Sequence, residues 1–291
     1  MRGDRDRLTY RVGRVAALRR YPVKSMLGER CDSVELSPLG VAGDRRYAVI
    51  DDATGHVATA KHPRLWSALL QCSSATGPDG VTVTLPDGRT VPVAEAAAPL
   101  SDLLGRTVHL ADERAAGAVL ERSDPIDVLT HGADAEIDPV LLELAQGAPG
   151  GAFVDHSPVH LISTATLDAV GVDHAEAIRY RPNIVVDTAN GALPFMENDW
   201  VGARIQLGQV VLRGTLPTPR CAVPTLRHGR SERLPGAVRR LLELNRVEVP
   251  GSGTLPCAGL YAEVVTAGTV DTGDEVRITG DVDVVEAGMK S

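Results

Sequence analysis

The clearest structural signal in this chain is VTVTLPDGRTVPV, residues 81–93. Valine alternates with polar residues on both sides of Pro86-Asp87-Gly88, and such alternation is typical of a half-buried strand. A Pro-Asp-Gly sequence between two alternating runs favours a tight turn. The stretch therefore predicts a β-hairpin.

The same pattern extends outward in both directions. Alternating apolar runs bounded by Gly, Pro and Asp occupy most of residues 12–93 and recur between residues 153 and 278. Helical patterning is confined to a few short segments, which are 63–71, 96–105, 138–146, 164–172 and 234–246. We predict a mostly β (α+β) fold, with a β-barrel packed against an N-terminal β-barrel-like domain and a few peripheral helices. The expected divisions are an N-terminal domain over 12–111, a connector over 112–150 and a second domain over 151–280.

Composition excludes several classes of protein. The 291 residues carry 30 Lys and Arg against 38 Asp and Glu, a net charge of −8. This balance argues against nucleic-acid binding, which needs a basic surface. No apolar run approaches the roughly 20 residues of a membrane span, and the N-terminus lacks the apolar stretch of a signal peptide. We expect a cytoplasmic protein with neither a nucleic-acid nor a membrane partner.

The cysteines must be judged singly, because no C-x-x-C pair occurs. Cys221 lies in LPTPRCAVPT, where three prolines favour an extended, rigid segment. The adjacent Arg220 favours the thiolate, which is the nucleophilic and metal-binding form. A small buried apolar role for Cys221 is the alternative. Cys31, Cys72 and Cys257 are expected to be structural.

Three turns place basic or amide side chains before or after predicted strands. They contain Lys24 and Ser25, then Asp44, Arg45 and Arg46, and then Arg179, Arg181 and Asn183. Such donors recognise phosphate and the polar edges of heterocycles. In an acidic chain their clustering indicates an anion pocket, unless each side chain is simply solvated.

Several motifs in order carry a family resemblance. They are YPVKSMLGE (21–29), LGVAGDRRYAVID (39–51), FVDHSPVHLIS (153–163), RYRPNIVVD (179–187), PTPRCAVPT (217–225) and GLYAEVVTAGTVDTGDEV (259–276). The chain resembles MOSC-domain proteins with the MOSC N-terminal β-barrel, and is similar to the amidoxime-reducing molybdenum enzymes among them. The resemblance runs from about Val12 to Ile278.

The resemblance implies a molybdenum cofactor of the molybdopterin type. By motif, Cys221 matches the molybdenum ligand, and Asp155 and Tyr261 match positions near the metal that could donate a proton. The positions that match cofactor contacts are Lys24, Ser25, Arg45, Arg181, Asn183 and Arg220. Residue chemistry agrees, since phosphate needs cations and soft molybdenum prefers thiolate.

Two functions follow as expectations. The first is an oxidoreductase that reduces the N–O bond of a small N-hydroxylated substrate. Because the chain has no C-x₄-C-x₂-C run for a [2Fe–2S] cluster, its electrons are expected from a separate donor protein of the ferredoxin or flavoprotein type. The second is a molybdenum-cofactor carrier or sulfurtransferase in which Cys221 carries a persulfide. The loop after Cys221 departs from the family pattern, which leaves the substrate open.

Overall fold

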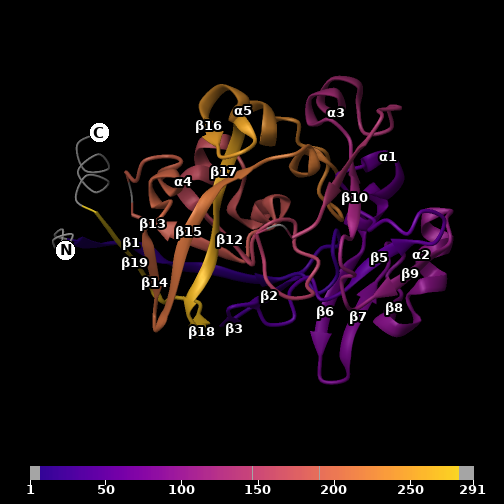
Figure 1. The fold of residues 1–291 in the computed structure, drawn as a ribbon, viewed down its shortest axis with the longest axis horizontal. Coiled ribbons are helices and arrows are strands. Elements are labelled where there is room, and N and C mark those ends of the chain that lie inside the picture. Colours follow the sequence, from indigo (N-terminus) through magenta and orange to yellow (C-terminus); the bar gives the residue numbers. More distant parts are fainter. Residues whose placement is uncertain (1–6, 146, 190, 282–291) are drawn as a thin grey trace.

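The computed structural model describes residues 7–145, 147–189 and 191–281, and its main feature is a closed barrel of seven strands (Figure 1). Around the barrel the order is β12 (Val159–Ser163), β13 (Ile184–Thr188), β1 (Arg7–Arg20), β19 (Glu275–Asp281), β14 (Arg204–Leu207), β15 (Val210–Pro219) and β17 (Gly253–Thr266), which returns to β12. Every pair is antiparallel except β12 with β13. The predicted mostly β fold with a barrel is confirmed.

The barrel combines the two ends of the chain, because the N-terminal strand β1 lies between β13 and β19. Its interior is apolar: Leu18, Ile184, Ile205 and Leu260 are fully buried. The short strand β2 (Glu29–Cys31) extends the sheet beside β1, and β16 (Arg246–Val249) does so beside β17. Burial of such side chains is the main stabilising term for the barrel.

Short helices cover the outside of the barrel near β12 and β13. Parallel strands need a crossover, and α4 (Thr164–Val170) supplies part of it. The side chain of Ser163 caps α4 by accepting a hydrogen bond from the Thr166 N–H. The helix α5 (Gly236–Leu244) packs in the same cluster through Ala237 and Leu241. The 3₁₀ helices of this half are η3 (His174–Tyr180), η4 (Met196–Trp200) and η5 (Val223–Thr225).

The region after β2 forms small sheets. Two of them surround a second core that contains Val23, Trp66 and Leu100: β5 (Ala48–Asp51) with β9 (Val108–Ala111), and β6 (Ser73–Gly77) with β7 (Gly80–Thr84) and β8 (Thr90–Pro92). The sheet of β3 (Ser33–Ser37), β4 (Gly40–Val41) and β18 (Gly268–Asp271) packs instead on the barrel core, through side chains such as Leu36 and Val270. The helices are α1 (Pro63–Trp66), η1 (Ser67–Gln71), η2 (Val93–Glu95) and α2 (Ala97–Leu104). Strands β7 and β8 are the hairpin predicted over 81–93.

The connector differs from its prediction. The helix expected over 138–146 is wrong: β11 (Val140–Glu143) is a strand that pairs with β10 (Val119–Arg122). A short apolar run such as VLLEL is compatible with the periodicity of a helix and with that of a strand. Pairing with β10 makes it a strand. The connector's helix is instead α3 (Pro125–His131). The Asp124 side chain caps it by accepting hydrogen bonds from the N–H groups of Ile126 and Asp127. No described helix is long and apolar enough to cross a membrane.

Candidate functional site

Strand pairing gathers the predicted site residues at one end of the barrel. The segment that holds Lys24 and Ser25 follows β1, and Asn183 directly precedes β13, whose first residue pairs with Leu18 of β1. Tyr261 lies opposite His160 in the β12–β17 pair. Because β15 ends at Pro219, Cys221 reaches the same end of the barrel.

A cavity of about 310 Å³ opens at this end. All nine sequence-predicted site residues line it, namely Lys24, Ser25, Arg45, Asp155, Arg181, Asn183, Arg220, Cys221 and Tyr261. Among the described residues, seven basic ones line the cavity against two acidic ones, although the whole chain carries a net charge of −8. The cavity is therefore suited to an anion.

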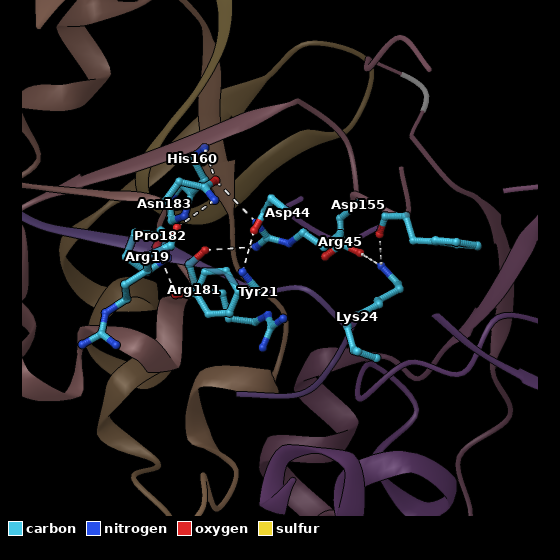
Figure 2. A network of polar contacts seen from close by, with 12 residues as sticks. Arg19, Tyr21, Lys24, Asp44, Arg45, Asp155, His160, Arg181, Pro182 and Asn183 are labelled. Atoms are coloured by element: carbon cyan, nitrogen blue, oxygen red, sulfur yellow. Dashed lines mark hydrogen bonds and ion pairs between the residues drawn. The ribbon is translucent and has the colours of Figure 1, made fainter. Parts of the chain in front are cut away.

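Two arginines enclose one aromatic ring. The guanidinium carbons of Arg45 and Arg181 lie 4.6 and 4.4 Å from the ring centre of Tyr21, which is fully buried (Figure 2). The Tyr21 hydroxyl donates to the Pro182 carbonyl at 3.0 Å, and Asp44 is an ion-pair partner of Arg45. Cation–π contact of this kind holds guanidinium groups in place without neutralising them.

Arg181 has unused hydrogen-bonding capacity. Its Nη1 donates to the Met26 carbonyl at 2.6 Å, but its buried Nη2 has no partner among the described residues. Burial and, to a smaller extent, the nearby charge of Arg45 lower the pKa of Arg181 to about 10. A buried donor without an acceptor is costly, so this nitrogen marks a place where an anionic ligand fits.

The backbone is also unusual here. Ser25, Arg45 and Arg181 have φ angles of 64°, 45° and 56°. Non-glycine residues in the left-handed region cost about 1–3 kcal/mol each and cluster at functional sites. Ser25 Oγ accepts a hydrogen bond from the Ala60 N–H at 3.1 Å. These backbone conformations set the directions in which the Arg45 and Arg181 side chains leave the main chain.

Asn183 is a positioning residue in this structure. Its Oδ1 accepts from the His160 N–H at 3.1 Å and from Arg45 Nη1 at 3.4 Å, while its Nδ2 donates to the Arg19 carbonyl (Figure 2). The buried amide thus ties β12 and β1 to Arg45. Through its side-chain oxygen, Asn183 holds the guanidinium group of Arg45, which faces the cavity.

Asp155 bridges two lysines. Its Oδ1 accepts from Lys24 Nζ at 2.5 Å, and its Oδ2 lies 3.1 Å from Lys61 Nζ. Burial alone would raise the pKa of Asp155, but Lys24 and Lys61 hold it well below the usual range. At neutral pH Asp155 is therefore a carboxylate that pairs with lysines, and the proton-donor role expected of it does not fit this geometry.

Lys24 is almost completely buried and also donates to the Phe153 carbonyl at 3.1 Å. Burial lowers its pKa to about 8, against the opposing effect of Asp155. Tyr261 is different, because burial and the charge of Asp155 raise its pKa above the usual value. Both groups hold a proton at neutral pH and face the cavity, so both can donate one.

Two arginines of the cavity wall use their side chains for hydrogen bonds within the protein. Arg220 donates from Nε to the Ala258 carbonyl and from Nη1 to the Tyr180 carbonyl, both at 2.9 Å, and its Nη2 meets His160. Arg179 donates to the Leu226 carbonyl at 3.0 Å. These contacts fix Arg220, and Arg220 thereby positions the adjacent Cys221.

Tyr261 is flanked by two histidines. The ring of His156 stacks on it with centres 5.6 Å apart, and His160 meets it edge-on at 5.8 Å. Burial and the charge of Arg220 hold the pKa of His160 well below its usual value, so this ring is neutral. Gly259 makes room for it, because a Cβ there would lie 2.6 Å from His160 Nε2.

Several residues of the site were not predicted from the sequence. Lys61 and Arg122 line the cavity, and Tyr21 supports Arg45. Lys61 stands alone among small and apolar residues in VATAKHP, which is the only sequence signal for it. The other three described cysteines do not line the cavity, and Cys257 lies within β17. Among the described residues, no group of three His, Cys, Asp or Glu is placed to hold a metal.

The fold and the site together define a β-barrel protein with a basic, cysteine-containing cavity at one barrel end. Family comparison agrees: residues 12–117 match the MOSC N-terminal beta barrel domain and residues 147–277 match the MOSC domain. The chain belongs to the MOSC-domain family, which is associated with binding of the molybdenum cofactor. Its resemblance to that family is thereby confirmed.

Individual relatives are distant. Mitochondrial amidoxime-reducing component 1 of Homo sapiens is 25% identical over 95% of this chain and 86% of its own length. The protein of the same name from Mus musculus is 24% identical over 96% and 86%. Among solved structures, the YUAD protein from Bacillus subtilis has a TM-score of 0.43 and 12% identity, covering 95% of this chain and 99% of that one.

Proposed function

We propose that this protein is a molybdenum-cofactor-dependent oxidoreductase that reduces N-hydroxylated substrates with electrons from a separate donor protein. The observation that carries the proposal is the meeting of Cys221 with a surplus of cations around one cavity. The name of the human and mouse relatives, amidoxime-reducing component, supports the type of reaction. The cytoplasm remains the proposed location, with a ferredoxin or flavoprotein as the proposed donor.

The residues present fit a pterin cofactor with an anionic phosphate. The unsatisfied Nη2 of Arg181 needs an acceptor, and Arg45 and Lys24 add positive charge beside it. Cys221 offers one soft thiolate ligand. When bound, the molybdenum cofactor would supply the two-electron reduction.

The chain's own groups would position the substrate and provide protons. Reduction of an N–OH group breaks the N–O bond, consumes two electrons and two protons, and releases the oxygen as water. Tyr261 and Lys24 are the proton donors that face the cavity, and a positioned acid is needed because hydroxide is a poor leaving group. Asp155 keeps the lysines in place as their counter-ion.

The test is expression in a host that makes the cofactor, followed by metal analysis and a reduction assay. We expect about one molybdenum per chain, bound through one thiolate, and conversion of benzamidoxime to benzamidine with reduced methyl viologen as electron donor. Protein without molybdenum that carries a persulfide on Cys221 and transfers its sulfur would contradict the proposal and favour the sulfurtransferase function.

A further inference from the structure

One wall of the cavity comes from a part of the chain that neither family match covers. The matches end at residue 117 and resume at residue 147, and between them β10 and β11 contribute Arg122, Leu142 and Glu143 to the cavity lining. The cofactor-contact motifs all lie outside this segment. It is therefore a candidate for recognition of something other than the cofactor.

The strand β10 directs Arg122 into the cavity. Its neighbour Glu121 is held between two histidines, with Oε1 3.2 Å from His56 Nδ1 and Oε2 3.0 Å from His62 Nδ1. Successive side chains of a strand point to opposite faces, so this clamp fixes Arg122 on the cavity face. The Ser123 N–H also donates to the Lys61 carbonyl at 3.1 Å, which places the end of β10 next to Lys61.

Arg122 differs from the other basic residues of the cavity in its lack of partners. The side chain of each of the other six makes a hydrogen bond or an ion pair with protein atoms, whereas the Arg122 side chain makes none with any described residue. Lys61 lines the same cavity as Arg122, and the contact of the Ser123 N–H with the Lys61 carbonyl places the two residues next to each other. Glu143 lines the same wall without forming an ion pair with Arg122 in the structure.

We infer that Arg122 is a specificity-determining residue that binds a carboxylate on the substrate. A guanidinium that faces a cavity with free donors can hold a carboxylate through two parallel hydrogen bonds. Leu142, on the paired strand, offers apolar contact to the body of the same molecule. The substrates are then N-hydroxylated compounds that also carry a carboxylate. For the reaction this inference rests on the proposed function, but the binding of the carboxylate does not.

The first test compares benzamidoxime with 4-carboxybenzamidoxime as substrates of the cofactor-loaded protein. In Arg122→Gln we expect the KM for the carboxylated compound to rise at least about tenfold more than the KM for benzamidoxime. Arg122→Lys should recover part of the loss, because it keeps the charge without the planar fork. Arg64→Gln is the matched control, since Arg64 is exposed, pairs with Glu136 and does not line the cavity.

The second test measures binding without turnover. Titration calorimetry of 4-carboxybenzamidine should show binding to the wild type that is weakened about tenfold in Arg122→Gln and unchanged in Arg64→Gln. If the wild type reduces neither amidoxime, the proposed function fails, and this titration still decides the inference.

Three results would overturn the role of Arg122. The wild type could show no preference for the carboxylated compounds, in reduction or in binding. Arg122→Gln could impair both substrates equally. It could also lose molybdenum, which would assign Arg122 to cofactor anchoring.

Discussion

Asp155 and Lys24, 131 positions apart in the chain, are joined by a hydrogen-bonded ion pair of 2.5 Å at the cavity wall. Lys61 approaches the other carboxylate oxygen of Asp155 at 3.1 Å. Two cations thus share one counter-ion beside the place proposed for the cofactor. The balance of these three charges makes both the stability and the anion affinity of the protein dependent on pH.

Asp155→Asn is expected to destabilise the protein at neutral pH, because Lys24 and Lys61 lose their counter-ion. The pKa of Asp155 is depressed in the folded state. Its contribution is therefore present above the unfolded value of about 4 and is lost as the pH falls towards the folded pKa. Urea unfolding at pH 7 and at pH 3 measures the difference between wild type and variant, which should shrink at the lower pH. An equal difference at both values would contradict the ion-pair role.

Anion binding should weaken as the pH rises through about 8, the lowered pKa of Lys24, because the neutral amine attracts no anion. Sulfate is a suitable probe, since its charge is constant in this range. Calorimetric titration of cofactor-free protein between pH 6.5 and 9 should show the decline in the wild type and a flatter profile in Lys24→Arg. Identical profiles for the two proteins would show that another group controls the affinity.

Arg181 and Arg220 are expected to respond differently to substitution, although both line the cavity. Arg220→Gln breaks buried hydrogen bonds from every guanidinium nitrogen and should lower the free energy of unfolding by about 3 kcal/mol. Arg181→Gln removes an unsatisfied buried donor and should cost about 1 kcal/mol or less. Cofactor content should nevertheless fall in Arg181→Gln. Chemical denaturation and pterin analysis check both values, and the opposite order of stability would contradict this division of roles.

Much of the site could be predicted from the sequence because its residues lie in short motifs at strand ends. The nine predicted positions meet in one cavity, and the pairing of β1 with β13 brings together those that flank these two strands. Lys61 and Arg122 could not be found in this way, since Lys61 joins the site through its ion pair with Asp155 and the place of Arg122 depends on how the connector folds. The strand β11 was missed for the same reason, because its pairing with β10 is not visible in a four-residue apolar run. The sequence also could not show that the side chains of Arg220 and Asn183 form their hydrogen bonds with other protein groups.

The other three cysteines are expected to be dispensable for metal binding. Cys72 and Cys257 are fully buried, and burial raises the pKa of each thiol, to about 12 and about 11. None of the three lines the cavity. Single Ser substitutions at Cys31, Cys72 and Cys257 should therefore leave the molybdenum content unchanged in elemental analysis. Loss of metal from any one of them would show that the ligand has been assigned wrongly or incompletely.

The most direct test of the central claim is X-ray absorption at the molybdenum edge for the wild type and Cys221→Ser. Sulfur and oxygen differ little in volume, but the serine hydroxyl is a hard and mostly protonated ligand. We expect a folded variant that has lost one sulfur ligand at molybdenum, or has lost the metal, with reductase activity at background. A folded Cys221→Ser protein with an unchanged spectrum and full activity would contradict the assignment of Cys221 as the ligand and the mechanism built on it.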